Sequence, residues 1–310
     1  WLLIFIIYFI PYALMVGELG SAFKFSSGGV SSWIWETIGP KMAYYAGWTY
    51  WIVHMPYISQ KPSAALIAGS WALFQDNRAS QMNTLVLQGI CLGVFLFAMY
   101  IVSKGIRILK TLATLAGTAM FVMSLLYILL MMAAPLITDA SLVNIHWDWD
   151  TFLPAFDMKF FTGLSILVFA VGGCEKISPY VNKMKDPSRD FSKGMIALAV
   201  MVAVCAILGT IAMGMMFDSR HIPDDLMTNG AYYAFQKLGG YYHAGNFFVI
   251  FYALTNLIGQ FSVMVLSIDA PLRMLLGSAD DEFIPKKMFV QNANGAYTCL
   301  LYTSDAADEL

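Results

Sequence analysis

The sequence is poor in charged residues and has no basic surplus. Asp, Glu, Lys and Arg make up 12% of the 310 residues, and the formal net charge is −2. Soluble domains carry about a quarter charged residues, and nucleic-acid-binding domains carry an excess of Lys and Arg. The composition therefore gives no reason to expect nucleic acid as a partner. Apolar residues make up 59%, too many for one soluble core to bury, which indicates a membrane protein.

Motifs for metal, disulfide and nucleotide chemistry are also lacking. No C-x-x-C pair occurs, so neither a disulfide framework nor a metal site is indicated, and no cofactor is expected. The sequence contains no H-E-x-x-H motif and no phosphate-binding P-loop pattern. These absences argue against a membrane-embedded metalloenzyme and an ATP-driven pump, and we expect no enzymatic activity. The four cysteines and the four histidines are scattered along the chain: Cys91, Cys174, Cys205, Cys299, His54, His146, His221 and His243.

Long apolar runs dominate what is present. A helix needs about 20 residues to cross the hydrocarbon core of a bilayer, and seven runs are long enough. The sequence therefore predicts an all-α, polytopic membrane protein. The expected spans cover residues 1–23, 42–74, 84–102, 111–137, 160–182, 194–217 and 246–272.

Basic residues alternate between the connecting loops. Twelve of the eighteen Lys and Arg residues lie in every second loop, and the opposite loops hold four. Because cytoplasmic loops are enriched in Lys and Arg, residue 1 is expected on the outer side of a bacterial inner membrane. The loops predicted to be cytoplasmic are 24–41, 103–110, 183–193 and 273–298. The outer segment 218–245 is either a short amphipathic helix over the outer mouth or a plain loop.

The run 160–182 contains a helix-breaking sequence. Gly172 and Gly173 are adjacent and are followed by Glu175 and Lys176. Adjacent glycines weaken a helix by about 1 kcal/mol each, and a charge at this depth costs at least about 2.5 kcal/mol unless it is partnered. Together they favour a discontinuous helix that lines a polar cavity, as in many transporters. The alternative is a close helix crossing at Gly172-Gly173 with Glu175 paired to another span. In either case Lys176 is expected to extend toward the cytoplasm and to have no catalytic role.

Other polar residues lie inside the expected spans. Asn256 and Gln260 are four residues apart, so they share a helical face and are expected to look inward. A single His54 is more often a helix contact than a proton carrier. Lys61 is expected to pair with an acid that the sequence does not identify.

Three motifs, in order, resemble the amino acid–polyamine–organocation permeases. They are Glu18 with Gly28-Gly29, Trp33 and Gly39-Pro40; G-G-C-E at 172–175 with V-N-K-M-K-D-P at 181–187; and Ala270-Pro271-Leu272-Arg273 followed by Pro285. Within this superfamily the likeness is nearest to the glutamate/γ-aminobutyrate antiporter branch and related bacterial permeases. Many members carry a glutamate shortly before the last proline of the second motif, where this chain has Lys183. This departure leaves the subfamily and the substrate open.

The resemblance implies two inverted five-helix repeats in which the first and sixth helices are broken. The seven spans then match helices two to eight, and residues 1–298 form a partial permease domain without helix one. In such permeases carbonyl groups at the break in helix six hold the α-amino group of the substrate. The resemblance implies a substrate site at Phe169 (an aromatic lid), Ala170, Gly172, Gly173, Glu175, His54 and Ser267.

Residues 299–310 resemble translated sequencing-library adapter and are expected to pack on nothing. For the whole protein, the resemblance implies secondary transport of amino acids by alternating access, through exchange or proton-coupled uptake. The alternative is a transporter-derived amino-acid sensor or a non-transporting membrane subunit. The expected partners are a small amino acid and membrane lipid, and the sequence does not reveal the oligomeric state.

Overall fold

The chain folds into a bundle of long helices in a computed structural model that describes residues 1–138, 156–217, 223–277 and 283–299. Within these residues the β-structure is a single isolated antiparallel bridge between Gln291 and Tyr297. The α-helices are α1 (Leu2–Ile4), α2 (Ile10–Ala22), α3 (Val30–Thr37), α4 (Pro40–Phe74), α5 (Thr84–Ser103), α6 (Ile106–Ile137), α8 (Met158–Val171), α9 (Pro187–Met216), α10 (Leu226–Tyr241) and α11 (Phe247–Leu276).

Shorter helical turns complete these elements. A π-helical turn at Phe5–Phe9 joins α1 to α2, so that Leu2–Ala22 forms one span. A 3₁₀ segment at Cys174–Lys183 follows α8 after two non-helical residues. Two further 3₁₀ turns lie at Arg78–Gln81 and Lys286–Phe289.

Six helices of the described chain are long and apolar enough to cross a membrane. They correspond to six of the seven predicted spans: Leu2–Ala22, Thr84–Ser103, Ile106–Ile137, Met158–Lys183, Pro187–Met216 and Phe247–Leu276. The remaining span, 42–74, is also helical, as the 35-residue α4, but is not among the six. Its sequence includes His54, Gln60 and Lys61, which lower its hydropathy. The all-helical prediction is confirmed, whereas the count of seven spans and the inverted repeat stay predictions.

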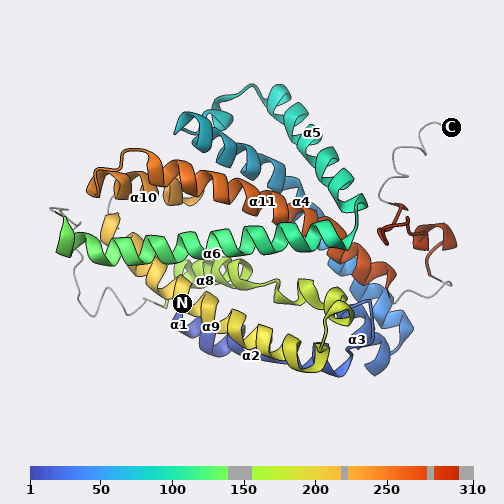
Figure 1. Cartoon of the computed structure of the whole chain (residues 1–310). Coiled ribbons are helices and arrows are strands. Elements are labelled where there is room, and N and C mark those ends of the chain that lie inside the picture. The colour runs from blue at the N-terminus through green and yellow to red at the C-terminus, as the bar shows by residue number, and fades with distance from the viewer. Residues whose placement is uncertain (139–155, 218–222, 278–282, 300–310) are drawn as a thin grey trace.

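Two groups of helices share the bundle. Helix α11 packs most extensively against α4 and also contacts α5, α6 and α10, and α2 packs along α9. The long axes of these helices run in broadly the same direction, with α5 diverging from the rest (Figure 1). One apolar core joins α2, α8 and α9 around Phe9 and Phe191. Another joins α4, α6, α9, α10 and α11 around Trp71 and Phe235.

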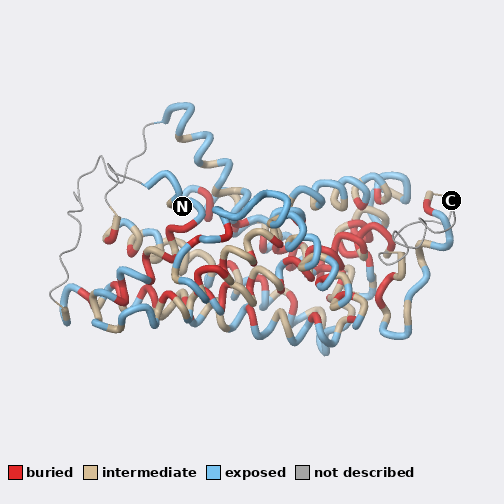
Figure 2. The backbone as a smooth tube through the Cα atoms, turned by 90° about the horizontal axis from the view of Figure 1, so that it is seen from above, coloured by how far each residue is buried: buried red, intermediate tan, exposed pale blue. Residues whose placement is uncertain are grey.

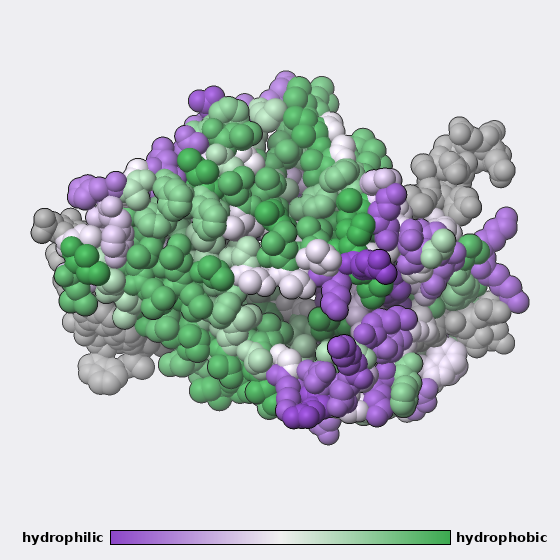
Figure 3. Space-filling model, viewed as in Figure 1, coloured by the Kyte–Doolittle hydropathy of each residue, from purple (hydrophilic) through white to green (hydrophobic). Residues whose placement is uncertain are grey.

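The outside of the bundle is apolar. Large hydrophobic side chains are exposed along the helices, among them Leu85, Leu129 and Leu136. Figure 3 shows a broad hydrophobic side, with hydrophilic residues gathered mainly toward the end that carries α3. Buried residues lie where the helices meet, and the outer faces are exposed (Figure 2). An apolar belt of this extent is suited to lipid rather than water.

The outer segment contains a helix rather than a plain loop. Helix α10 occupies Leu226–Tyr241 and buries Tyr232, Phe235 and Leu238 against the core. It lies at the opposite end of the bundle from α3 (Figure 1), as the predicted alternation of loops requires. Residues 218–222 of this segment lie outside the described residues.

At the C-terminal end, the prediction that residues 299–310 pack on nothing is wrong for Cys299. This side chain is half-buried and packs against the cluster around Leu272, Leu276 and Tyr297. The thiol side chain of Cys299 is apolar enough to pack in that cluster, which explains why the prediction fails at this residue. Residues 300–310 lie outside the described residues, so the remainder of that prediction stays open.

Candidate substrate site

The helix break is present at the predicted glycines. Helix α8 ends at Val171, Gly172 is extended (φ −65°, ψ 158°), and Gly173 takes a left-handed conformation with φ 108°. Residues with side chains rarely adopt such a φ. The chain then resumes as a 3₁₀ segment at Cys174. The prediction of a discontinuous helix at Gly172-Gly173 is confirmed.

The break leaves backbone carbonyl groups without helical partners. The last bond of the α8 ladder runs from the Gly172 N–H to the Val168 carbonyl oxygen, at 3.1 Å. Among the described backbone contacts, the carbonyls of Phe169, Ala170 and Val171 accept no bond from the residue four positions ahead. Free carbonyls at membrane depth require another donor. They therefore form a set of acceptors suited to an ammonium group.

Glu175 lies just beyond the break and is bound by two tyrosines. Its Oε2 accepts a hydrogen bond from the Tyr12 hydroxyl at 2.5 Å, and its Oε1 accepts one from the Tyr50 hydroxyl at 2.8 Å. Glu175 as a whole residue is 9% exposed. Tyr12 comes from α2 and Tyr50 from α4, so Glu175 joins three segments that are far apart in sequence. Among the described residues, Glu175 is therefore neither paired with a cation nor free, because both of its oxygens accept hydrogen bonds from tyrosines on other helices.

One face of α4 carries an aromatic and polar series. Tyr50, His54, Tyr57 and Lys61 are spaced by four, three and four residues, which places them on one side of a helix. The rings of Tyr50 and His54 are 4.4 Å apart, and those of His54 and Tyr57 are 6.1 Å apart. His54 Nδ1 lies 2.8 Å from the Tyr50 carbonyl oxygen. His54 is therefore a member of this series rather than an isolated helix contact.

Lys176 points from the break toward α4 and α11. Its Nζ lies 4.6 Å from the centre of the Tyr57 ring and 3.4 Å from Ser267 Oγ. Ser267 is fully buried on α11. The expectation that Lys176 turns toward the cytoplasm is therefore not met, since an aromatic ring and a buried hydroxyl attract its ammonium within the bundle.

Hydrogen bonds through two amide side chains connect Lys61 to Tyr232 on α10. Lys61 Nζ lies 3.4 Å from Gln260 Oε1, and the Gln260 amide donates to Asn256 Oδ1 at 3.2 Å. The Asn256 amide in turn donates to the Tyr232 hydroxyl at 2.7 Å. The predicted inward face of Asn256 and Gln260 is confirmed. The predicted acid partner of Lys61 is replaced by a neutral amide in the described part of the chain.

The structure brings most of the predicted site residues into one region. Phe169 lies edge-on to Tyr57, with the ring centres 6.2 Å apart, and remains 71% exposed. Ala170 is exposed beside it. Through Tyr57, Tyr50 and Lys176, the side chains of Phe169, His54, Glu175 and Ser267 are linked across α8, α4, the 3₁₀ segment and α11.

A cleft of 740 Å³ opens beside Glu175, between α3 and α4. Its walls are mainly apolar, with Tyr50, His54 and Glu175 as polar members. A smaller cleft on the other side of Tyr50 also reaches Glu175 and Tyr12. The buried carboxylate is therefore approached from two sides. Among the described residues, no group of three His, Cys, Asp or Glu side chains could hold a metal ion.

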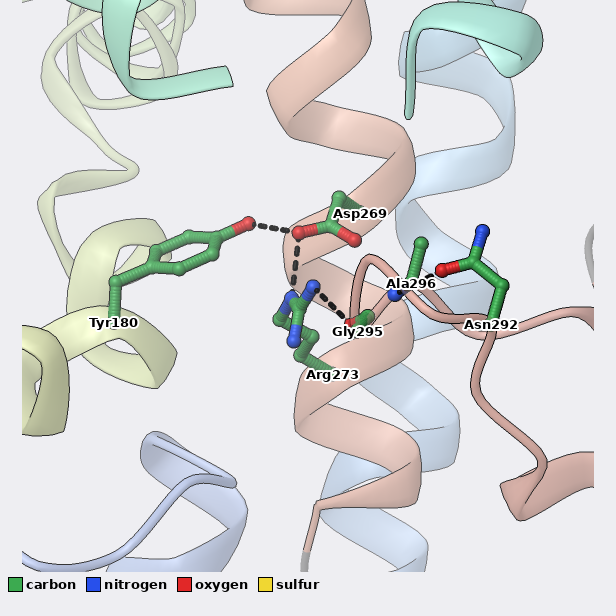
Figure 4. Close-up of polar contacts among 6 residues, drawn as sticks. All are labelled: Tyr180, Asp269, Arg273, Asn292, Gly295 and Ala296. Carbon is green, nitrogen blue, oxygen red and sulfur yellow. Dashed lines mark hydrogen bonds and ion pairs between the residues drawn. The ribbon is translucent and has the colours of Figure 1, made fainter. Parts of the chain in front are cut away.

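A second buried carboxylate, that of Asp269, lies near the C-terminal end of α11. Asp269 is 1% exposed, and its Oδ2 is 2.6 Å from Arg273 Nε and 2.5 Å from the Tyr180 hydroxyl. Arg273 also donates to the Gly295 carbonyl at 3.0 Å. In Figure 4 Tyr180 approaches Asp269 from the 3₁₀ segment, and the loop around Gly295 closes on Arg273 from the other side. This network ties three separate parts of the chain together.

Sequence reasoning missed Tyr12, Tyr50 and Tyr57 as functional residues. The four-three-four spacing along 50–61 was available as a signal for the α4 residues. Tyr12 offered no such signal, because only the folded packing of α2 against the break brings it to Glu175.

Comparisons with known proteins agree with this geometry. The amino acid permease family matches residues 1–301. The chain is 53% identical over 292 residues to the aspartate/glutamate permease AcaP of Lactococcus lactis subsp. cremoris, covering 92% of this chain and 59% of AcaP. It is 24% identical over 212 residues to the inner membrane transporter YjeM of Escherichia coli, covering 64% of this chain and 41% of YjeM.

A third relative is the probable agmatine/putrescine antiporter AguD of Lactococcus lactis subsp. lactis. It is 22% identical over 226 residues, which cover 72% of this chain and 46% of AguD. The chain spans less than two thirds of the length of each of these relatives. The names of these relatives are those of permeases, transporters and antiporters, and the family match together with the apolar helices indicates a multi-pass protein of the bacterial inner membrane. The chain belongs to the amino acid permease family of the amino acid–polyamine–organocation superfamily.

Proposed function

We propose that the whole protein is a secondary transporter that moves amino acids across the bacterial inner membrane by alternating access. The observation that carries the proposal is the break at Gly172-Gly173, with unpaired carbonyls before it and the buried Glu175 after it. Interrupted helices near the middle of the membrane are a common way for transporters to bind small polar substrates. The inverted five-helix repeat is part of the same proposal.

In this mechanism the break binds the backbone end of the substrate. The carbonyls of Phe169, Ala170 and Val171 accept hydrogen bonds from the α-ammonium group, because they lack helical partners. Gly172 and Gly173 allow the substrate to approach the backbone closely. Phe169, exposed and in contact with Tyr57, covers the substrate. His54 and Ser267 line the same region from α4 and α11.

Glu175 connects the helix break to α2 and α4, and in this mechanism these elements move relative to one another. It binds Tyr12 on α2 and Tyr50 on α4 through its two oxygens. A change in either bond would alter how the break sits against the two helices. Exchange and proton-coupled uptake are both compatible with this arrangement.

Acidic amino acids are the proposed substrates. AcaP, whose name gives aspartate and glutamate as its substrates, is 53% identical to this chain over 292 residues. That similarity covers the helix break, α4 and α11, the elements that carry the proposed site. The alternative, a transporter-derived sensor, would keep the site and bind the amino acid without moving it.

Transport by the protein expressed from its complete gene tests this proposal. Purified protein in liposomes is expected to accumulate labelled glutamate above the level of empty liposomes. Preloading with unlabelled glutamate would speed uptake in an exchanger, and an inward proton gradient would drive it in a proton-coupled carrier. Binding of glutamate without accumulation under either condition would favour the sensor.

A further inference from the structure

Two lysines meet at one aromatic ring in the middle of the bundle. Lys61 Nζ lies 4.3 Å from the centre of the Tyr57 ring, and Lys176 Nζ lies 4.6 Å from it. Because both ammonium groups lie against the same ring, the two like charges repel each other. An aromatic ring attracts one cation, but it does not neutralise two. We call Lys61 and Lys176 the lysine pair.

Neither lysine of the pair forms an ion pair with a carboxylate in the described part of the chain. The ion pair recorded there joins Asp269 to Arg273 and involves neither lysine. Lys61 and Lys176 contact the neutral Gln260 and Ser267 at 3.4 Å, a long distance for a hydrogen bond. The carboxylate next in sequence, Glu175, attracts Lys176 but forms no ion pair with it, and its oxygens receive hydrogen bonds from two tyrosines. Two cations within a membrane span are costly without an anion.

The pair lies at the depth of the helix break. At a rise of about 1.5 Å per residue, Gln260 and Ser267 lie about 20 and 30 Å along the 30-residue α11, that is, around its middle. A side chain built on Gly173 would meet nothing nearer than Cε and Nζ of Lys176, at 3.9 and 4.0 Å. A side chain on Gly173 would therefore touch only the Lys176 side chain, which lies directly beside the break.

We propose that Lys61 and Lys176 bind the side-chain carboxylate of an acidic amino acid and so determine the specificity of the carrier. This inference rests on the proposed transport function and assigns its substrate preference to two residues. The carbonyls of the break take the ammonium end of the substrate, and the lysine pair takes the acidic end. Tyr57 holds both lysines in position through its ring. A neutral amino acid leaves the two charges uncompensated and binds less well.

The test compares glutamate with glutamine, which has the same shape without the charge. Full-length protein in liposomes is assayed as wild type, Lys61→Gln and Lys176→Gln. Loss of a bond to a charged group removes about 1.5–3 kcal/mol, so each variant is expected to lose about ten- to hundredfold in kcat/KM for glutamate. Its kcat/KM for glutamine is expected to stay within a few-fold of wild type. The ratio of the two kcat/KM values, which measures the preference for glutamate, therefore falls. Lys176→Arg is expected to restore part of the preference for glutamate.

A matched control is Lys159→Gln, which removes an exposed lysine from α8 and is expected to preserve the preference. Binding is also read as stabilisation against heating by glutamate or glutamine, which reports on variants that fold but do not transport. A wild-type preference retained in both lysine variants would overturn the specificity proposal while leaving transport intact. Stabilisation of the wild type by chloride, lost in Lys176→Gln with no effect of glutamate, would also overturn it. Absence of all amino-acid transport and binding in the wild type would overturn the proposed function itself.

Discussion

Two buried carboxylates among the described residues, Asp269 and Glu175, have different electrostatic surroundings. Asp269 accepts a tyrosine hydrogen bond and lies 2.6 Å from the guanidinium of Arg273. Glu175 accepts two tyrosine hydrogen bonds and has no cation in contact among the described residues. The lysine next to it, Lys176, turns instead toward Tyr57 and Ser267. Charge is thus balanced internally at Asp269, whereas around Glu175 the cations remain available to a ligand.

This difference separates two roles within one bundle. A buried ion pair with satisfied hydrogen bonds fixes the relative positions of its elements, here α11, the 3₁₀ segment and the loop at Gly295. A carboxylate held only by hydroxyl groups can exchange partners at lower cost. We expect the Asp269 network to serve structure and the Glu175 region to serve transport. Substitutions at Gly173, Asp269 and Glu175 test that division, and one at a surface carboxylate provides a reference.

The largest effect is expected from closing the space at the break. Gly173→Leu forces a side chain onto a residue with φ 108° and directs it beside Lys176. Uptake of labelled amino acid by the full-length protein should be abolished, while insertion into the membrane is retained. The control is Gly163→Leu on α8, where a side chain meets nothing within 4 Å. Uptake at the wild-type rate by Gly173→Leu would show that the break is not part of the substrate site.

The next largest effect is a loss of stability, expected when Asp269 loses its ion pair with Arg273. Asp269→Ala leaves Arg273 buried without its partner, which costs about 3–5 kcal/mol in comparable ion pairs. Thermal unfolding in detergent should show this as a large fall in melting temperature. The double variant Asp269→Ala/Arg273→Met removes both charges and should recover much of the loss. If the single variant is as stable as the double, the pair does not fix the fold in the way argued above.

A smaller loss of stability is expected at Glu175. Glu175→Gln keeps an oxygen that accepts from one tyrosine and loses the charge, which lowers the strength of each bond by about 1 kcal/mol. The expected loss is about 1–2 kcal/mol in the same unfolding measurement, together with impaired transport. Glu175→Leu, which offers no acceptor, should be less stable than Glu175→Gln. A loss in Glu175→Gln as large as that in Asp269→Ala would contradict the proposed contrast.

The smallest effect is expected at a carboxylate on the surface. Hydrogen bonds from Tyr233 and Asn229, at 2.6 and 2.9 Å, lower the pKa of Asp225 below its ordinary value of 3.8. A lowered pKa means that these bonds stabilise α10 above pH 3.8 and that this stabilisation is lost as the pH falls through the lowered value. The melting temperatures of wild type and Asp225→Asn should therefore converge as the pH falls below that range. A constant difference would show that the charge of Asp225 is not involved.

Much of this arrangement could be predicted from the sequence. Hydropathy located the helices, and the glycine pair with Glu175 located the break, because both depend on neighbouring residues. The partners of Glu175 could not be predicted, since Tyr12 and Tyr50 lie 163 and 125 residues away. Lys61 was expected to find an acid, but the fold places Gln260 and Tyr57 beside it. Such pairings depend on how distant helices pack, which periodicity along one helix does not contain.

The two prolines of α4 give its central segment a mechanical property of its own. Pro56 and Pro62 lie inside the helix, and proline has no amide hydrogen to donate to the carbonyl four residues earlier. The carbonyls of Ile52 and Ile58 therefore lose their bonds on either side of Tyr57. A helix bends where such bonds are missing. Tyr57 thus lies between two positions where helical hydrogen bonds are missing, and Lys61 lies beside the second. The backbone that carries these two side chains is therefore less constrained by helical bonds than the part of α4 that holds Tyr50.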